Sequence, residues 1–248
     1  ITDAGVVTGF SDAYYALPKE ERPTTIKMPN TIRGITPVEI ADNAFDESDN
    51  SDDIVLIVLP GSVQVIGKEA FKDAEHMKSF GFHGTPKLTT MEEGAFRGCM
   101  SLLSFSCPTG LTEIPAYAFY ECTSLSTFSF NAGLTKIGAS AFENCSRLKG
   151  ELKLPGNLLT IDQNAFFKCA SINKIYIPEL LKNLGSGAFG RMASLSMIEK
   201  HAGNTNFEAI ENVLYQKEND GTYALITYPA QKKNPIYTIP LVKGKLVT

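Results

Sequence analysis

Four of the five cysteines recur at a near-constant interval, and each stands three residues after a phenylalanine: Cys99, Cys122, Cys145 and Cys169. Three other phenylalanines are followed at the same distance by Ser48, Ala74 and Met192. A position that accepts these four residue types is a small, mostly buried slot, in which a cysteine acts as a small hydrophobe. The pattern therefore favours buried thiols.

Two other kinds of chemistry are possible for these cysteines. Stacked cysteines could form disulfides, but parallel side chains in a ladder rarely reach the required dihedral angle, and Cys107 makes the total an odd number. No Cys-x-x-Cys or Cys/His spacing indicates a metal site or a nucleophile. Cys107 occupies an apolar strand position and has the same interpretation, although the redox state of the cysteines stays open.

One glycine-rich motif and one acidic cluster resemble ligand sites. Gly185 to Gly190 is a literal Gly-x-Gly-x-x-Gly, but no βαβ unit surrounds it, so we predict no nucleotide and no cofactor. The acidic stretch contains five carboxylates: Asp46, Glu47, Asp49, Asp52 and Asp53. It lacks the glycine and the closing glutamate of a dedicated calcium loop. A solvated acidic insertion is favoured, and calcium binding remains the alternative.

Catalytic groups do not gather at any one repeat position. His76, His83 and His201 are scattered, and no Ser/His/Asp or paired-carboxylate set falls on a common face, so we do not predict an enzyme. Asn144-Cys145-Ser146 is a formal glycosylation sequon, but its central cysteine belongs to the buried series, which favours a structural role.

Charge and hydropathy exclude several classes of partner. The chain has 248 residues, a formal net charge of −4 and a pI near 5.5. Nucleic acid and anionic membranes require a basic surface, so neither is predicted as a partner. The longest apolar run, Ile54 to Leu59, ends at Pro60 and is too short to span a bilayer. We expect no membrane insertion in this segment, and no signal segment is recognisable at its start.

The dipeptide Ala-Phe repeats along most of the chain. It occurs seven times, with its phenylalanines at Phe45, Phe71, Phe96, Phe119, Phe142, Phe166 and Phe189. The intervals are 26, 25, 23, 23, 24 and 23 residues, whereas chance would give about one such dipeptide. Such near-constant spacing indicates a repeat architecture.

Each repeat also contains a strand-like pattern, Leu-x-x-apolar-x-apolar-Pro, as in Leu102 to Pro108 and Ile172 to Pro178. The copy that begins at Leu148 carries one inserted residue, Gly150. Alternation places every second side chain of the strand inward, and the Ile-Gly-x-x-Ala-Phe block turns the chain back across the far side. Because one such unit cannot bury its apolar face alone, the coils must stack. The sequence predicts a mainly β solenoid of about seven coils of ~23 residues, with short helical or irregular turns on the far side and end caps.

The combined motif, Leu-x-x-Ile-x-Leu-Pro followed by Leu-x-x-Ile-Gly-x-x-Ala-Phe-x-x-Cys-x-x-Leu, resembles the BspA-like leucine-rich-repeat proteins from about Ile32 to Ile198. The resemblance implies a leucine-rich-repeat solenoid from an exported bacterial surface protein, in a class implicated in adhesion and host-protein binding. The segment after Asn204 resembles the hairpin that follows the repeats in this family. There, Glu211-Asn212 replaces the common Asp-Gly turn, and no further Ala-Phe block follows Pro240.

The two ends of the chain lack the repeat and are predicted to form caps. Strands are expected near Val6 to Phe10 and Thr25 to Met28. Val213 to Lys217 and Tyr223 to Tyr228 flank the turn residues Asn219-Asp220-Gly221, which predicts a hairpin. We divide the chain into an N-terminal cap (1–36), leucine-rich repeats (37–202), and a C-terminal hairpin cap or the start of a further repeat block (203–248).

The outward side chains of successive strands would form one continuous surface, which is where repeat proteins generally bind partners. The candidate binding residues on it are Lys78, Ser104, Ser106, Thr127, Ser129, Lys153, Lys174 and Tyr176. Tyr176 beside two lysines could anchor an acidic or carbohydrate partner. Val55, Leu56 and Val58 are apolar and outward, which predicts that the N-terminal cap or a second subunit packs on them.

We therefore expect an exported, extracellular or cell-surface binding module, which recognises an extracellular protein or glycan through the outward face of the repeat sheet. The alternative is a structural spacer that holds other domains away from the surface and has no ligand of its own. The sequence leaves open the ligand, the oligomeric state and whether the chain is complete.

Overall fold

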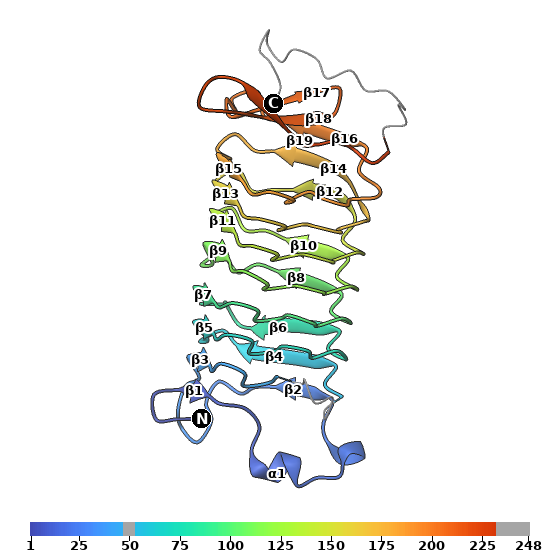
Figure 1. The fold of residues 1–248 in the computed structure, drawn as a ribbon. Helices are drawn as coiled ribbons and strands as arrows, with labels where there is room; N and C mark the ends of the chain where they lie inside the picture. The colour runs from blue at the N-terminus through green and yellow to red at the C-terminus, as the bar shows by residue number, and fades with distance from the viewer. Residues whose placement is uncertain (47–52, 232–248) are drawn as a thin grey trace.

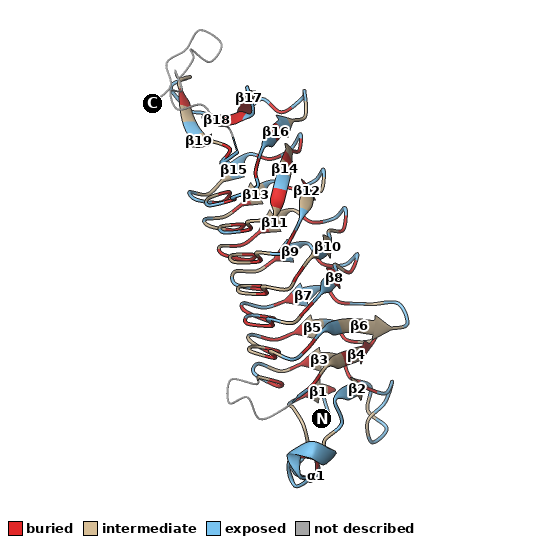
Figure 2. Cartoon of the chain, turned by 90° about the vertical axis from the view of Figure 1, so that its right-hand side faces the viewer, coloured by how far each residue is buried: buried red, intermediate tan, exposed pale blue. Residues whose placement is uncertain are grey.

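The structure is a computed structural model that describes residues 1–46 and 53–231. The chain winds into a column of stacked β coils, with the N-terminal residues at one end and the antiparallel strands β17, β18 and β19 at the other (Figure 1). The predicted solenoid of about seven coils is confirmed. Buried residues recur in each coil along the length of the column (Figure 2).

One side of the column is formed by the longer strands, which run parallel to one another. They are β2 (Thr25–Lys27), β4 (Leu56–Pro60), β6 (Ser79–His83), β8 (Ser104–Ser106), β10 (Thr127–Ser129), β12 (Gly150–Lys153), β14 (Ile172–Ile177) and β16 (Met197–Lys200). Hydrogen bonding divides them into three sheets, β2-β4-β6, β8-β10 and β12-β14-β16. We call their shared solvent-facing side the outward face.

A second series of short parallel strands pairs coil to coil, and within the repeats only a turn was expected at these positions. Its members are β1 (Val6–Val7), β3 (Glu39–Ile40), β5 (Val65–Ile66), β7 (Thr90–Met91), β9 (Glu113–Ile114), β11 (Lys136–Ile137), β13 (Thr160–Ile161) and β15 (Asn183–Leu184). Two residues are too few to show the alternation by which a strand is recognised in a sequence. These strands exist because stacking aligns the same dipeptide of neighbouring coils.

The Ala-Phe turns form a buried column of aromatic rings. The seven repeat phenylalanines follow one another with centroid separations of 5.1 to 6.0 Å and ring planes tilted by at most 27°. The backbone N–H of each of the first six also donates a hydrogen bond to the next coil, as in Phe119 N–H to the Ala141 carbonyl at 2.8 Å. Side-chain packing and backbone pairing therefore hold the coils together at the same point.

Two residues of nearly every turn have a left-handed backbone, with φ between 52° and 73°. They stand two positions before and two positions after the repeat phenylalanine, and they include Glu69, Tyr117, Lys168 and Arg191 as well as glycine and asparagine. Left-handed φ costs a non-glycine residue about 1–2 kcal/mol. Stacking offsets this cost, since Tyr117 N–H and Glu121 N–H each donate a hydrogen bond to the next coil at 2.9 Å.

The repeat cysteines are buried thiols, as predicted. None of the five cysteines, which all lie in described residues, is in a disulfide. The thiols of Cys99, Cys122, Cys145 and Cys169, which we call the ladder thiols, each donate a hydrogen bond of 3.1 or 3.2 Å. The acceptor is the carbonyl of the phenylalanine one coil earlier, as for Cys145 and Phe119. Burial, with a smaller contribution from Cys169 and Cys122, raises the pKa of the Cys145 thiol well above its ordinary value.

In the coil of β10, Asn131 stands where most other coils have the strand-ending proline. Asn131 follows β10, and its amide donates to the carbonyls of Pro108 and Leu111 at 2.7 and 2.8 Å, while its Oδ1 accepts the Gly133 N–H. Asn131 is 8% exposed, so these bonds satisfy a buried amide. The residue ties the end of its strand to the preceding coil.

The N-terminal segment adds one strand to each series. β1 and β2 lie within or near the predicted strands, and α1 (Asp12–Tyr15) and a 3-10 turn (Lys19–Glu21) join them. β2 pairs edge-on with β4, Thr25 opposite Leu56 and Lys27 opposite Val58. The cap therefore lies beside β4 in the sheet, and Val55, Leu56 and Val58 remain half-buried.

The C-terminal strands form the predicted hairpin. β17 (Phe207–Ile210), β18 (Val213–Lys217) and β19 (Tyr223–Thr227) are antiparallel. Glu211 and Asn212, which replace the common Asp-Gly, both have positive φ, 48° and 66°, as a tight two-residue hairpin requires. Phe207 and Leu214 from this hairpin join the core of the coils.

Candidate functional site: the outward face of the long strands

The outward face consists of two rows of side chains that alternate with the core positions of the long strands. Strand pairing aligns Ser104 with Thr127 and Ser106 with Ser129, and it aligns Lys153 with Tyr176 and Tyr176 with Glu199. The structure thus brings most of the predicted binding residues onto one surface. Lys78 is also exposed, but it stands one residue before β6, at the side of this surface.

The three sheets of long strands carry three different outward surfaces. The first presents apolar or small side chains on β4 and β6, at Leu56, Val58, Ser79 and Gly81, and its edge strand β2 adds Thr25 and Lys27. The second presents only hydroxyl groups, and all four of its residues are exposed: Ser104, Ser106, Thr127 and Ser129. The third presents charged and larger side chains: Glu151, Lys153, Lys174, Tyr176, Met197 and Glu199. The outward face therefore changes from one sheet to the next, although the core beneath it does not.

Two carboxylates that the sequence analysis missed neutralise part of the predicted basic site. Lys174 Nζ lies 2.9 Å from Glu199 and 3.9 Å from Glu151, on the two neighbouring strands. The hydrogen bond to Glu199, helped by the charge of Glu151, raises the pKa of the Lys174 ammonium. Both glutamates share the alternation of Lys174 and Tyr176, so the strand register contained the signal. Within the described part of the chain Lys153 forms no ion pair.

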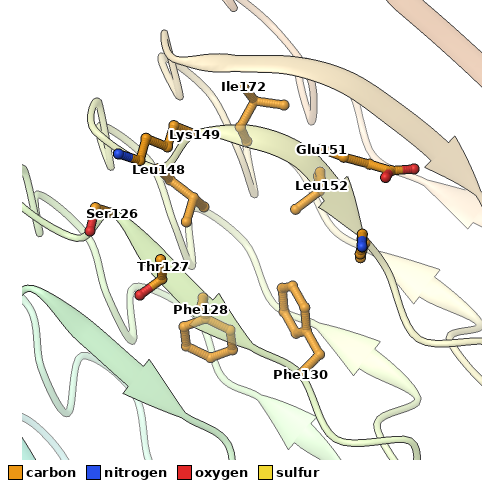
Figure 3. Close-up of a pocket in the computed structure, with 10 residues that line it drawn as sticks. Ser126, Thr127, Phe128, Phe130, Leu148, Lys149, Glu151, Leu152 and Ile172 are labelled. Carbon is orange, nitrogen blue, oxygen red and sulfur yellow. The ribbon is translucent and has the colours of Figure 1, made fainter.

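A cleft lies in the outward face between β10 and β12 (Figure 3), and the strand on one side of it, β12, begins at the inserted Gly150. Gly150 has φ +81°, and the pairing of β12 with β14 shifts register between Gly150 and Glu151. The cleft has a volume of about 190 Å³. Its floor is apolar, formed by Phe128, Phe130, Leu148, Leu152 and Ile172, and its edge is polar, formed by Ser126, Thr127, Lys149, Glu151 and Lys153. We call it the β10–β12 slot.

A second break, between β6 and β8, has a different character. It holds a cleft of about 380 Å³ over Phe80, Phe82 and Phe105. The other lining residues are Gly81, Gly84, Pro86, Ser104 and Ser106, so none of the lining residues is charged. Core aromatic groups are thus accessible at both breaks, and charged groups surround only the β10–β12 slot.

Tyr176 is half-buried and lies between two shallow clefts near the C-terminal end of the face. One, of about 450 Å³, extends past Asn157, Glu179 and His201. The other, of about 400 Å³, extends past Glu199, Lys200 and Asn212. The ring is accessible from both sides, which suits an aromatic contact residue.

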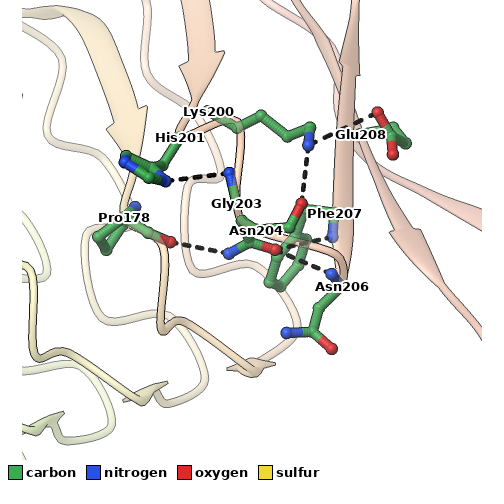
Figure 4. Close-up of polar contacts among 8 residues, drawn as sticks. All are labelled: Pro178, Lys200, His201, Gly203, Asn204, Asn206, Phe207 and Glu208. Carbon is green, nitrogen blue, oxygen red and sulfur yellow. Dashed lines mark hydrogen bonds and ion pairs between the residues drawn. The ribbon is translucent and has the colours of Figure 1, made fainter.

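The junction between the coils and the C-terminal hairpin is held by a polar cluster around Asn204 (Figure 4). The Asn204 amide donates to the Pro178 and Leu181 carbonyls at 2.8 and 3.0 Å, and its Oδ1 accepts N–H groups of Asn206 and Phe207. Lys200 Nζ donates to the Asn204 carbonyl at 2.7 Å and lies 3.8 Å from Glu208. Like Asn131, Asn204 uses its side-chain amide to bind two carbonyls of the preceding coil. The cluster thereby holds the hairpin next to the outward face.

The other sequence motifs have structural explanations. At Gly67, Gly138 and Gly185 a side chain would collide with the backbone of the preceding coil, so the glycines allow the coils to approach closely. His76 pairs with Asp53 at 3.7 Å, while His83 bonds the Met28 carbonyl and His201 accepts the Gly203 N–H. The three histidines therefore do not meet.

The acidic stretch is only partly visible. Asp46 pairs with Lys72, and Asp53 with Lys19, at 3.6 and 3.5 Å. Residues 47–52, which include Glu47, Asp49 and Asp52, lie outside the described residues, so the calcium alternative stays a prediction. Among the described residues no three His, Cys, Asp or Glu side chains cluster as metal ligands would.

Comparison with known proteins identifies the class. Residues 38–150 and 135–220 match the BspA type leucine rich repeat region in six copies. The match covers well over half of the chain, so the protein belongs to this family of leucine-rich-repeat proteins. A search of curated protein sequences finds no match. In the described segments 1–46 and 53–231, no helix is both long and apolar enough to cross a bilayer.

Two solved structures illustrate the relationship. A leucine rich cell surface protein from Faecalibacterium prausnitzii is 27% identical, with a TM-score of 0.78 over 88% of this chain. The pneumococcal vaccine antigen PcpA is 26% identical, with a TM-score of 0.56 over 87% of this chain. The matches span 57% and 49% of those two chains, so this chain corresponds to about half of each.

Proposed function

We propose that this chain is the partner-binding module of a bacterial surface protein, and that it recognises an extracellular protein or glycan through its outward face. The surface location is part of the proposal, and it is supported by the description of the F. prausnitzii relative as a cell surface protein. The observation that carries the proposal is the division of the outward face into three different surfaces above a uniform core. Packing explains the uniform core, but packing does not require the face to change.

The C-terminal third of the face is the strongest part of the proposed contact surface. It combines the unpaired ammonium of Lys153 with the accessible ring of Tyr176 on adjacent strands. Lys174 contributes less than its charge suggests, because Glu151 and Glu199 already bind it. The hydroxyl groups of Ser104, Ser106, Thr127 and Ser129 extend the surface with groups that both donate and accept hydrogen bonds.

An array of extracellular-matrix proteins, glycans and bacterial surface polymers tests the proposal. The purified chain is compared with a Lys153→Glu/Tyr176→Ala variant. A matched control, Lys182→Glu/Tyr117→Ala, makes the same chemical changes away from the long strands. We expect at least one hit that the face variant loses and the control keeps. Hits that the face variant retains would place binding elsewhere, and an array without hits would favour the structural spacer.

A further inference from the structure

The β10–β12 slot exposes core side chains that are covered in most coils, and Phe80 and Phe82 are half-buried in the same way at the β6–β8 break. Along the central core row, Ile57, Phe105, Leu152, Ile175 and Ile198 are at most 4% exposed. Phe128 belongs to the same row, yet it is only half-buried, and its neighbour Phe130 is half-buried too. The sheet break thus leaves apolar surface accessible within a polar face, which is typical of a contact site.

Two cations without partners stand at the ends of the strand that borders the slot. Lys149 immediately precedes β12 and Lys153 is its last residue, and both are exposed slot-lining residues. In the described part of the chain neither ammonium forms an ion pair, whereas the slot's one carboxylate, Glu151, faces Lys174. The β6–β8 break, with no charged lining residue, shows that an opened sheet does not by itself bring lysines to its edge.

The size of the slot limits what can enter it. Sites for complete small molecules usually have volumes of roughly 300–1,000 Å³. The slot, at about 190 Å³, is smaller and suits a single apolar side chain. Interfaces between proteins commonly depend on one such anchor in a pocket, surrounded by polar contacts.

We propose that the β10–β12 slot is an anchor site for an acidic protein segment, which inserts one apolar side chain over Phe128 and Phe130 and places carboxylates against Lys149 and Lys153. The two lysines are four residues apart, which is at most roughly 13 Å, because Gly150 interrupts the extended backbone between them. Residues i, i+2 and i+4 of an extended segment share one face. The matching partner sequence is acidic-x-apolar-x-acidic, with the apolar residue in the centre. This inference rests on the proposed function and specifies its partner as a protein.

Short labelled peptides test the recognition pattern with the whole chain. The probe carries Glu-Ser-Phe-Ser-Glu, one control peptide replaces the phenylalanine with serine, and another replaces both glutamates with lysine. Binding is followed by fluorescence polarisation. We expect saturable binding of the probe, at least tenfold weaker binding of the serine peptide, and no measurable binding of the lysine peptide. Equal binding of the three peptides, or no saturable binding of the probe, would overturn the proposal.

Protein variants test the location. Lys149→Glu/Lys153→Glu is expected to weaken probe binding at least tenfold, whereas Lys87→Glu/Lys182→Glu, with the same change of charge away from the long strands, leaves it unchanged. Circular dichroism checks that both variants fold. Probe binding that the first variant retains would overturn the proposed site. The proposal would also be overturned if the unmodified chain self-associates and the first variant does not, because a second copy of the chain would then fill the slot. Array hits without probe binding would overturn the anchor alone, and an array without hits would overturn the binding function itself.

Discussion

On the turn side of the solenoid the same residue types recur in coil after coil, whereas the outward face differs between the three sheets of long strands. Every turn carries its Ala-Phe pair and a small residue or methionine three positions later, and every such phenylalanine is at most 5% exposed. From β4 onward, the outward positions run from apolar or small, through hydroxyl-bearing, to mainly charged. Each coil faces another coil at its turn and faces solvent at its outward side, so only the turn is constrained by packing.

The seven repeats therefore act as a comparison within one chain. Positions that stay the same in every coil hold the coils together, and positions that change are available for recognition. Gly150 is the informative exception, because the strand register shifts at this inserted residue, and the cleft beside its strand leaves Phe128 and Phe130 only half-buried. Three measurements test this division between the turn side and the outward face.

The largest expected effect is the loss of a ring from the turn column. Phe119 is fully buried, and it stacks on Phe96 and Phe142 at 5.4 Å each. Phe119→Ala is expected to lower the free energy of unfolding by about 3–5 kcal/mol, because it removes buried surface and leaves a cavity. Denaturant unfolding measures the change. On the outward face of the next long strand, Ser129→Ala is expected to change it by less than about 0.5 kcal/mol. Similar effects of the two substitutions would contradict the division.

The second effect concerns the cysteine ladder. Burial raises the pKa values of the Cys145 and Cys169 thiols, so at pH 8 these groups stay protonated and react poorly as nucleophiles. We expect the four ladder thiols to react with Ellman's reagent at least about 100-fold more slowly than in the unfolded chain, because reaction requires local opening.

Cys107 is the internal control for that measurement. It is only half-buried, although burial also raises its pKa, and it should react first. Denatured protein should release five thiols per chain. A lower number would show disulfides, and reaction of the ladder thiols before Cys107 would contradict their burial.

The smallest effect comes from the left-handed turn positions. Lys168 has φ +60°, and its neighbouring coils place other residues in the same conformation. Lys168→Gly is expected to raise the free energy of unfolding by up to about 1 kcal/mol, because glycine adopts this conformation without strain. The gain is reduced by loss of the weak contact between Lys168 Nζ and the Phe167 ring, 5.7 Å from its centroid.

Ala170→Gly is the matched control, two residues further on at a position with negative φ. There glycine brings only extra flexibility to the unfolded chain, and the substitution should destabilise the protein by about 0.5–1 kcal/mol. Thermal unfolding of both variants measures whether each substitution stabilises or destabilises the protein. Destabilisation by both would show that the turn at Lys168 is not strained.

Much of the coil was predictable from single residues and their spacing. The period, the inward alternation of the strands, the buried cysteine position and the C-terminal hairpin follow from local patterns. The left-handed residues do not, because Tyr117, Lys168 and Arg191 have no preference for positive φ and adopt it only where a turn pairs with its neighbour. The short strands such as β9 and β11 are equally dependent on that neighbour.

The candidate site was predictable only in outline. The outward positions of Ser104, Thr127, Lys153 and Tyr176 follow from alternation, but the character of the surface depends on distances between strands. The ammonium group of Lys174, for example, is already paired with Glu151 and Glu199 on the neighbouring strands. The β10–β12 slot could not be predicted from Gly150 alone, since an inserted glycine could also have been accommodated in a loop.

The repeat pattern is enough to require a stack of coils with an apolar interior, because one coil of about 23 residues cannot bury its inward side chains without a neighbour. Which outward groups are available, where the sheet opens and which charges are already paired depend on how the coils pack against one another. Each repeat carries its own pattern of inward apolar side chains, so burial can be read from single repeats. The pairing of outward charges between coils depends instead on the register of neighbouring strands.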